Sequence, residues 1–561
     1  MLNKTLKFLL ILITFYQSPL YSKSVSFNNF NSKNLSNYFS GIVAFENKSN
    51  SEALKFFNSS KILINNHDPY LERYVTTLVL EKKVSEAIDI IKKNTTKKNS
   101  NFFDAYLLLI IDSLKKDDFE KAYKDLNDAF TFAKQDRFNL AILETLQQYI
   151  FVFKEKKLME GKKNYGSLSL ISETFQRCYL GDSKTENYFL NLINENEADY
   201  TRYVYFYLSY LISNNKFEEV KKIVTEINYV NSTLLLSQGK SWVESFNFKK
   251  FQSVFFCKNH KHVIGEFLFL ISNLYSSQDN YEKSNYYLYL SNFLNPKFVY
   301  NLSLISENYY LNKDYKKSKK ILKNFSKEDD LYFWYRKKKE AQIIAKEKNK
   351  EKSLEFIQSE FDKIEKPNNK MIFDLGNFYK NAKKYDAAIK YYSILIENLN
   401  DTAEIKSDLL YRRGGSYERK GDYVNADKDL MDSLSINPDN AYVLNYLAYS
   451  WLERNFKIEE AIEMLETAYD LRSDDPYIID SIGWAYYLVN DYFKAEEFLK
   501  RAVELMPDDP IVNDHYGDIL WKLDQKIQAR YFWNNVLQME DVEKEMIEKI
   551  NSKLIKGPKK S

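Results

Sequence analysis

Glycine and proline are scarce in this chain. Only 13 of its 561 residues are Gly and 9 are Pro, although β-rich and loop-rich proteins need both residue types at their many tight turns. Hydrophobic residues nevertheless make up 44% of the sequence. That fraction is enough to bury a continuous core and excludes intrinsic disorder. The composition therefore predicts an all-α protein.

Cysteine is scarcer still, with two residues, Cys178 and Cys257. Two cysteines exclude a small scaffold held together by several disulfides. We expect both thiols to be unpaired and buried, because free Cys is among the most buried residue types. One disulfide that closes a long loop is the alternative.

An excess of one charge is also missing. The formal net charge is +3, which gives no electrostatic sign of nucleic-acid binding. Basic runs at residues 336–339 and 556–560 are typical of solvated helix faces. We therefore expect no nucleic-acid partner.

Apolar runs long enough to span a membrane are missing from the sequence. The clearest apolar stretch lies near the N-terminus and is too short to span. Lys4 and Lys7 accompany the apolar residues 8–15, and small polar residues follow at Ser22 and Ser24. This layout predicts a secretory signal peptide over residues 1–22, cleaved after Ser22 or Ser24. We expect a periplasmic protein without a transmembrane segment. It would also be without an N-terminal lipid, since no Cys follows the leader.

The chain shows a repeat of about 35 residues, marked by pairs of small residues twelve positions apart. Two antiparallel helices approach closely only where both carry small side chains, so the pairs mark helical hairpins. A proline follows the second helix in two of the units, at Pro438 and Pro507. The clearest pairs are Gly376 with Ala388, Gly414 with Ala426, Gly483 with Ala495, Gly517 with Ala529 and, with one inserted residue, Ala448 with Ala461.

At these residues the chain resembles the tetratricopeptide repeat family. The resemblance implies helix-turn-helix repeats stacked into a right-handed superhelical solenoid. It is specific over residues 263–540 and weaker over 35–130. Residues 131–262 are predicted to hold degenerate helical repeats, and residues 541–561 a basic C-terminal tail.

A closer resemblance concerns residues 444–449, 480–486 and 512–521. These segments are similar to a family of exported bacterial repeat proteins. One member is an outer-membrane lipoprotein that serves as adaptor for a periplasmic C-terminal processing protease. The resemblance implies a periplasmic scaffold or adaptor whose partner is a polypeptide, such as an envelope-biogenesis or protease complex. This chain differs from that member because it lacks the lipidation Cys.

Residues able to do chemistry are few, and we predict no catalytic, metal or cofactor site. Cys257, His260 and His262 could offer ligands to a metal, but no second cluster accompanies them. His515 has acids nearby but no nucleophile signature. Gly414 falls at a packing position and starts no phosphate loop. An enzyme hidden in residues 131–262 is the remaining alternative.

We predict a partner-binding groove on the first helices of residues 441–522, with Trp484 as its energetic centre. Positions 2, 5, 9 and 12 of each first helix share one face, and they carry aromatic and acidic side chains in turn. The acids predict a partner segment with Lys or Arg beside apolar side chains. A cell-wall glycan is the alternative ligand, and packing between repeats is the alternative role of each aromatic. The residues are Tyr442, Asn445, Tyr449, Leu452, Tyr477, Asp480, Trp484, Tyr487, Ile511, Asp514, Asp518 and Trp521.

Overall fold

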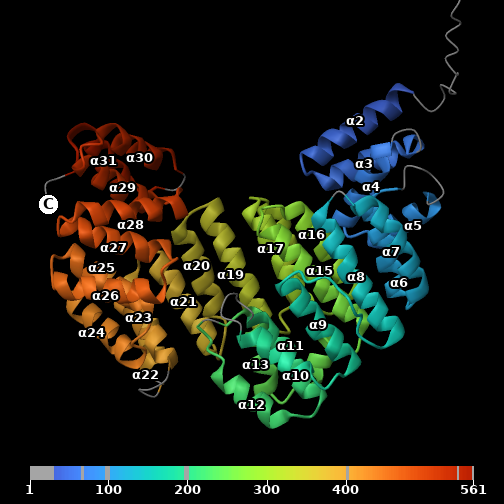
Figure 1. Cartoon of the computed structure of the whole chain (residues 1–561), viewed down its shortest axis with the longest axis horizontal. Coiled ribbons are helices and arrows are strands. Elements are labelled where there is room, and N and C mark those ends of the chain that lie inside the picture. Colours follow the sequence, from blue (N-terminus) through green and yellow to red (C-terminus); the bar gives the residue numbers. More distant parts are fainter. Residues whose placement is uncertain are drawn as a thin grey trace, which may run out of the picture. The chain divides into compact units, whose positions relative to one another are not determined.

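The computed structural model describes residues 31–64, 68–94, 101–134, 136–194, 201–230, 232–397, 399, 404–539 and 542–558. Within these ranges the secondary structure is helical and contains no strand (Figure 1). The all-α prediction is confirmed. The predicted signal peptide lies outside the described residues. No helix that the structure describes is both long and apolar enough to cross a membrane.

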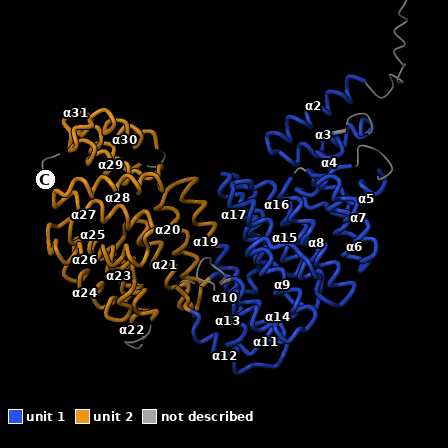
Figure 2. Tube along the Cα trace, in the orientation of Figure 1, with its two compact units in different colours: residues 1–227, 233–336 blue, residues 228–232, 337–561 orange. Residues whose placement is uncertain are grey.

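The chain divides into two compact units (Figure 2). The first comprises residues 1–227 and 233–336, and the second comprises residues 228–232 and 337–561. The helices of the first unit are α2 (Ser32–Glu46), α3 (Asn50–Ser59), η2 (Lys61–Leu63), α4 (Asp68–Leu80), α5 (Val84–Asn94), α6 (Phe103–Lys115), α7 (Phe119–Ala133), α8 (Arg137–Glu155), α9 (Ser167–Leu180), α10 (Thr185–Asn194), α11 (Thr201–Ser213), α12 (Phe217–Glu226), α13 (Leu234–Glu244), α14 (Lys249–Val254), α15 (His260–Ser276), α16 (Tyr281–Leu294), η4 (Val299–Asn301), α17 (Leu302–Leu311) and α18 (Tyr315–Leu322).

The boundary between the units falls within α19 (Asp330–Glu347). The second unit continues with α20 (Lys350–Phe361), α21 (Asn369–Asn381), α22 (Tyr385–Glu397), α23 (Glu404–Lys420), α24 (Tyr423–Ile436), α25 (Ala441–Glu453), α26 (Ile458–Leu471), α27 (Pro476–Leu488), α28 (Tyr492–Leu505), α29 (Pro510–Lys522), α30 (Lys526–Gln538) and α31 (Lys544–Lys556).

The small residues predicted to mark helix contacts do lie at them. A Cβ atom added to Gly483 would lie 2.8 Å from Cγ of Leu499, one helix later. Similar close approaches occur at Gly376, Gly414 and Gly517. Pro438 and Pro507 directly follow the caps of α24 and α28. The paired alanines are fully buried: Ala388, Ala426, Ala448, Ala461, Ala495 and Ala529. The predicted small residues of the second unit therefore lie buried at helix contacts.

The described residues between 131 and 262 are mostly helical despite their poor repeat pattern. They form the end of α7, helices α8 to α14 and the start of α15. The expectation of two unpaired thiols was wrong. Cys178 and Cys257 form a disulfide, with 5.8 Å between their Cα atoms. The end of α9 and the turn before α15 come together in the first unit, a proximity that their separation of 79 residues does not reveal.

The first unit folds back on itself instead of stacking only neighbouring hairpins. Helix α16 packs against α4, α5 and α6, and α15 packs against α6 and α8. Polar contacts hold this closure. The Nζ atom of Lys283 lies 2.8 Å from a carboxylate oxygen of Asp104, and Lys115 donates a hydrogen bond to the carbonyl of Phe293. Consequently, segments almost 180 residues apart line common surfaces.

Candidate functional site

The predicted groove face of α25, α27 and α29 is open only at the first turn of each helix. Tyr442, Tyr477 and Ile511 occupy the second position of their helices and are 46%, 55% and 52% exposed. The capping residues explain this placement. Asp475 and Asp509 each accept two backbone hydrogen bonds from the first turn of α27 and α29. Each cap fixes the helix start, so the next apolar side chain is held at the edge.

Deeper along the same face, the predicted groove residues are buried, and this part of the prediction was wrong. Asp480, Asp514 and Asp518 are at most 5% exposed, and Leu452 and Tyr487 are equally buried. Successive first helices touch each other, since α25 contacts α27 and α27 contacts α29. Positions 5, 9 and 12 therefore contribute to helix contacts. Asn445, Tyr449, Trp484 and Trp521 lie between these extremes and are half-buried.

His515 lies at the centre of this face and contacts residues of α27. Its Nδ1 atom lies 2.9 Å from Oδ2 of Asp480, which joins α29 to α27. Burial alone would lower the pKa of His515, but Asp480 and two further acids outweigh burial and raise the pKa. The ring of Trp484 stacks on His515 with centroids 4.1 Å apart and on Tyr487 at 4.7 Å. Trp484 also donates from Nε1 to Glu453. The ion pair and the stacking hold the ring of His515 between α27 and α29.

The last helix neutralises the other two acids. Lys553 of α31 places Nζ 2.5 Å from Oδ1 of Asp514 and 2.7 Å from Oδ2 of Asp518. Lys549 lies 3.0 Å from Asp514. Burial alone would raise the pKa of Asp514, but Lys553 and Lys549 outweigh it and lower the pKa. Burial raises the pKa of Asp518 to about 6. The segment expected as a basic tail is thus largely a docked helix, whose Ile550 is fully buried.

Acids do remain exposed beside the open edge, in the loops between repeats. Asp439, Asp474 and Asp508 are exposed, and each lies three residues before one of the exposed apolar side chains of the edge. We call the six residues Asp439, Tyr442, Asp474, Tyr477, Asp508 and Ile511 the edge row. The spacing of these residues is present in the sequence, but the three aspartates lie in loops, outside the helix face that the repeat positions define.

A groove of about 660 Å³ adjoins the edge row at Tyr442. The end of α26 and the start of α23 contribute to its walls. Arg472 lies over the ring of Tyr442, with its guanidinium carbon 5.8 Å from the ring centroid. Tyr411, Arg412 and Leu471 also line the groove. Its size is that of a ligand site, and its lining offers both aromatic surface and charge.

Each of the three residues considered as metal ligands makes a contact within the first unit. Cys257 is in the disulfide. His260 contacts the carbonyl of Leu114 at 2.9 Å, and Nδ1 of His262 accepts a hydrogen bond from the backbone of Phe256. Burial lowers the pKa of both histidines, to about 4 for His262.

Comparison with known proteins finds a known repeat type in part of the chain. Residues 370–396 and 407–440 match the tetratricopeptide repeat family. A TPR repeat-containing protein of Pseudomonas aeruginosa is 38% identical over 89 residues, which are 16% of this chain and 15% of that relative. The chain therefore spans less than a sixth of the relative that it matches.

Among solved structures, similar chains include a thermophilic TPR protein of Thermus thermophilus, with 18% identity and a TM-score of 0.30. The match covers 34% of this chain and all of that one. Another is the pilF protein of Pseudomonas aeruginosa, with 19% identity and a TM-score of 0.28, covering 34% of this chain and 83% of that one. A third is MamA of Desulfovibrio magneticus, with 18% identity and a TM-score of 0.27, covering 31% and 97%.

Proposed function

Because the chain carries tetratricopeptide repeats, which are typically non-catalytic binding scaffolds, we propose that it is a non-enzymatic scaffold for a polypeptide partner. The edge row is the binding surface. Three exposed apolar side chains recur there at the repeat spacing, each beside an exposed aspartate. The helices that carry these side chains touch each other in succession, and exposed apolar side chains that gather in one patch are characteristic of interaction sites.

The chemistry of the edge row selects a partner segment that carries Lys or Arg beside apolar side chains. Asp439, Asp474 and Asp508 supply the negative charge that the buried acids of the helix face cannot supply. The groove beside Tyr442 receives the end of the segment. Exposed charges are screened over about 8–10 Å at physiological ionic strength, so the complex weakens as salt is added.

The proposed cellular setting of this scaffold is the periplasm. The layout of residues 1–24 supports export to the periplasm. The resemblance to exported repeat proteins supports an adaptor that recruits an envelope-biogenesis or protease complex.

A random peptide library screened against the full chain tests the proposal. We expect enriched peptides to combine Lys or Arg with apolar residues. Tyr477→Ala should weaken the best peptide about tenfold, because central aromatic side chains carry much of the affinity of an interface. Phe493→Ala is the matched control, since Phe493 is 85% exposed and lies in the first turn of α28, a helix that contributes no residue to the edge row. Enrichment of acidic peptides, or equal losses in both variants, would show that the edge row is not the site.

A further inference from the structure

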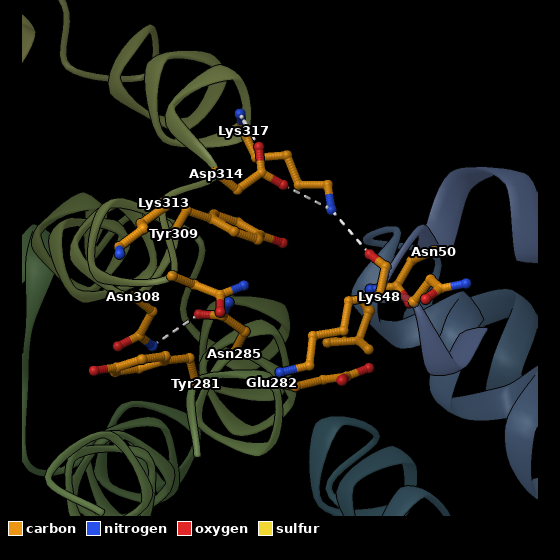
Figure 3. Close-up of a pocket in the computed structure, with 13 residues that line it drawn as sticks. Lys48, Asn50, Tyr281, Glu282, Asn285, Asn308, Tyr309, Lys313, Asp314 and Lys317 are labelled. Atoms are coloured by element: carbon orange, nitrogen blue, oxygen red, sulfur yellow. Dashed lines mark hydrogen bonds and ion pairs between the residues drawn. The ribbon is translucent and has the colours of Figure 1, made fainter. Parts of the chain in front are cut away.

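A polar pocket of about 380 Å³ lies in the first unit, where Leu80 at the end of α4 meets three other segments (Figure 3). Lys48 and Asn50 come from the turn between α2 and α3 and from the start of α3. Glu282 and Asn285 come from α16, and residues 308–317 come from α17, α18 and their turn. No single repeat contains this pocket, so its ligand would be held only when the closure is complete.

The walls of the pocket are held in place by their own polar contacts. Lys317 donates from Nζ to the backbone carbonyl of Lys48 at 3.2 Å and pairs with Asp314 at 3.0 Å. Elsewhere in the lining, Nδ2 of Asn308 donates a hydrogen bond to Oδ1 of Asn285 at 2.9 Å. Asn308 is fully buried. The pocket is therefore preformed, as is usual for small-ligand sites.

Two acceptor atoms of the pocket have no donor among the described residues. They are Oδ1 of Asn50 and Oε1 of Glu282, and both atoms are buried. Asn50 is only 5% exposed. Burial raises the pKa of Glu282, although Lys48 and Lys317 lower it in part. An acceptor that is buried without a donor costs free energy, and a ligand that supplies the donor recovers it.

The charge of the lining restricts the ligand. Lys48, Lys313 and Lys317 outnumber Glu282 and Asp314, so a cationic ligand would meet a net positive lining. An anionic ligand would place its own acceptors against the two unmet acceptors. A neutral hydroxyl group avoids both problems, because it donates one hydrogen bond and still accepts others from amide and ammonium groups.

We propose that this pocket binds a neutral, polyhydroxylated ligand, namely one or two sugar rings at the end of a glycan. The volume is at the lower end of the range of small-ligand sites, about 300–1,000 Å³. The rings of Tyr281 and Tyr309 also line the pocket and provide apolar surface for the faces of a sugar ring. The site lies in the first unit and does not depend on the edge row of the second.

A glycan array probed with the full chain tests this proposal. We expect signals on neutral glycans and none on sulfated or sialylated ones. Calorimetry then compares the best neutral glycan with the free disaccharide that corresponds to its terminal rings. The comparison shows whether the pocket contacts only the terminal rings or more of the glycan. Equal affinity for the disaccharide and the longer glycan supports recognition of a glycan end. Tighter binding of the longer glycan would contradict a pocket limited to the terminal rings.

Variants connect the binding to the two acceptors. Glu282→Ala and Asn50→Ala should each weaken the best neutral glycan about tenfold or more, and neither should lower the melting temperature, because each removes an unsatisfied acceptor. Glu218→Ala is the matched control, since that side chain is 88% exposed. The proposal is overturned if no neutral glycan binds, if only charged glycans bind, or if both variants bind as the control does. Tyr477→Ala should leave glycan binding unchanged, so this test is independent of the polypeptide partner.

Discussion

Removing the ammonium group of Lys553 should release the last helix from the array. Its Nζ atom bridges Asp514 and Asp518, and all three residues are at most 5% exposed. Deleting one member of a buried ion pair typically costs about 3–5 kcal/mol, because the remaining charge is left unpaired. Lys549 still lies near Asp514, so for Lys553→Met we expect the lower figure. About 3 kcal/mol corresponds to a factor of about 150 in the opening equilibrium of α31.

The pH dependence of this effect has a definite sign. Burial raises the pKa of Asp518 to about 6, while Lys553 lowers it in part. A carboxyl group whose folded pKa is raised stabilises the fold when protonated, and that stabilisation is lost as the pH rises through the folded pKa. Without Lys553 the pKa of Asp518 rises further. The loss of stability caused by Lys553→Met should therefore be largest above pH 7 and smaller near pH 5.

Amide hydrogen exchange of residues 544–556 is the suitable measurement, because it reports local opening, whereas a chain of two units does not unfold in one two-state step. Lys556→Met is the control, since Lys556 is exposed on the same helix. Exchange in Lys553→Met should accelerate about 150-fold, and exchange in the control should not change. Equal exchange rates in the two variants would refute the reasoning that the buried pair holds α31.

Two further substitutions test the packing of each unit. Gly483→Leu should destabilise the second unit by about 2 kcal/mol or more, because a Cβ atom there already meets Leu499 at 2.8 Å. Amide hydrogen exchange in α27 and α28 that is as slow as in the wild type would contradict the repeat register. Replacing Cys178 and Cys257 together by Ser should destabilise the first unit by about 4 kcal/mol, since the bridge closes a loop of 79 residues. Amide hydrogen exchange in the first unit should become faster, while exchange in the second unit stays unchanged. An equal increase in both units would contradict a stabilising effect of the disulfide that is confined to the first unit.

Sequence periodicity predicted the contacts within a hairpin but not those between hairpins. The spacing of Gly483 and Ala495 depends on two helices that are close in sequence, and the structure places both residues as expected. Asp514 and Asp518 were predicted to face a groove because positions 5 and 9 of a first helix share one face. Their partner Lys553 lies more than 30 residues later, on a helix that had been expected as a tail.

Contacts between distant segments left even less trace in the sequence. The pairing of Cys178 with Cys257, and the pocket that joins residues 47–50 to residues 281–317, both arise from the path of the first unit. A repeat pattern describes each hairpin relative to the next one along the chain. It contains no information on where an array bends back to meet its own beginning.

The closure of the first unit also affects how fast this protein folds. An open array can nucleate at any hairpin and grow from there. Here Asp104 must find Lys283, 179 residues later, so α4 to α6 lack part of their packing until that region has been made. Ribosomes add about 5–20 residues per second, so the residues up to Lys283 are synthesised about 10–35 s after Asp104. Non-local contacts of this kind slow folding, so the first unit should mature more slowly than the second, whose contacts are mostly between neighbouring helices.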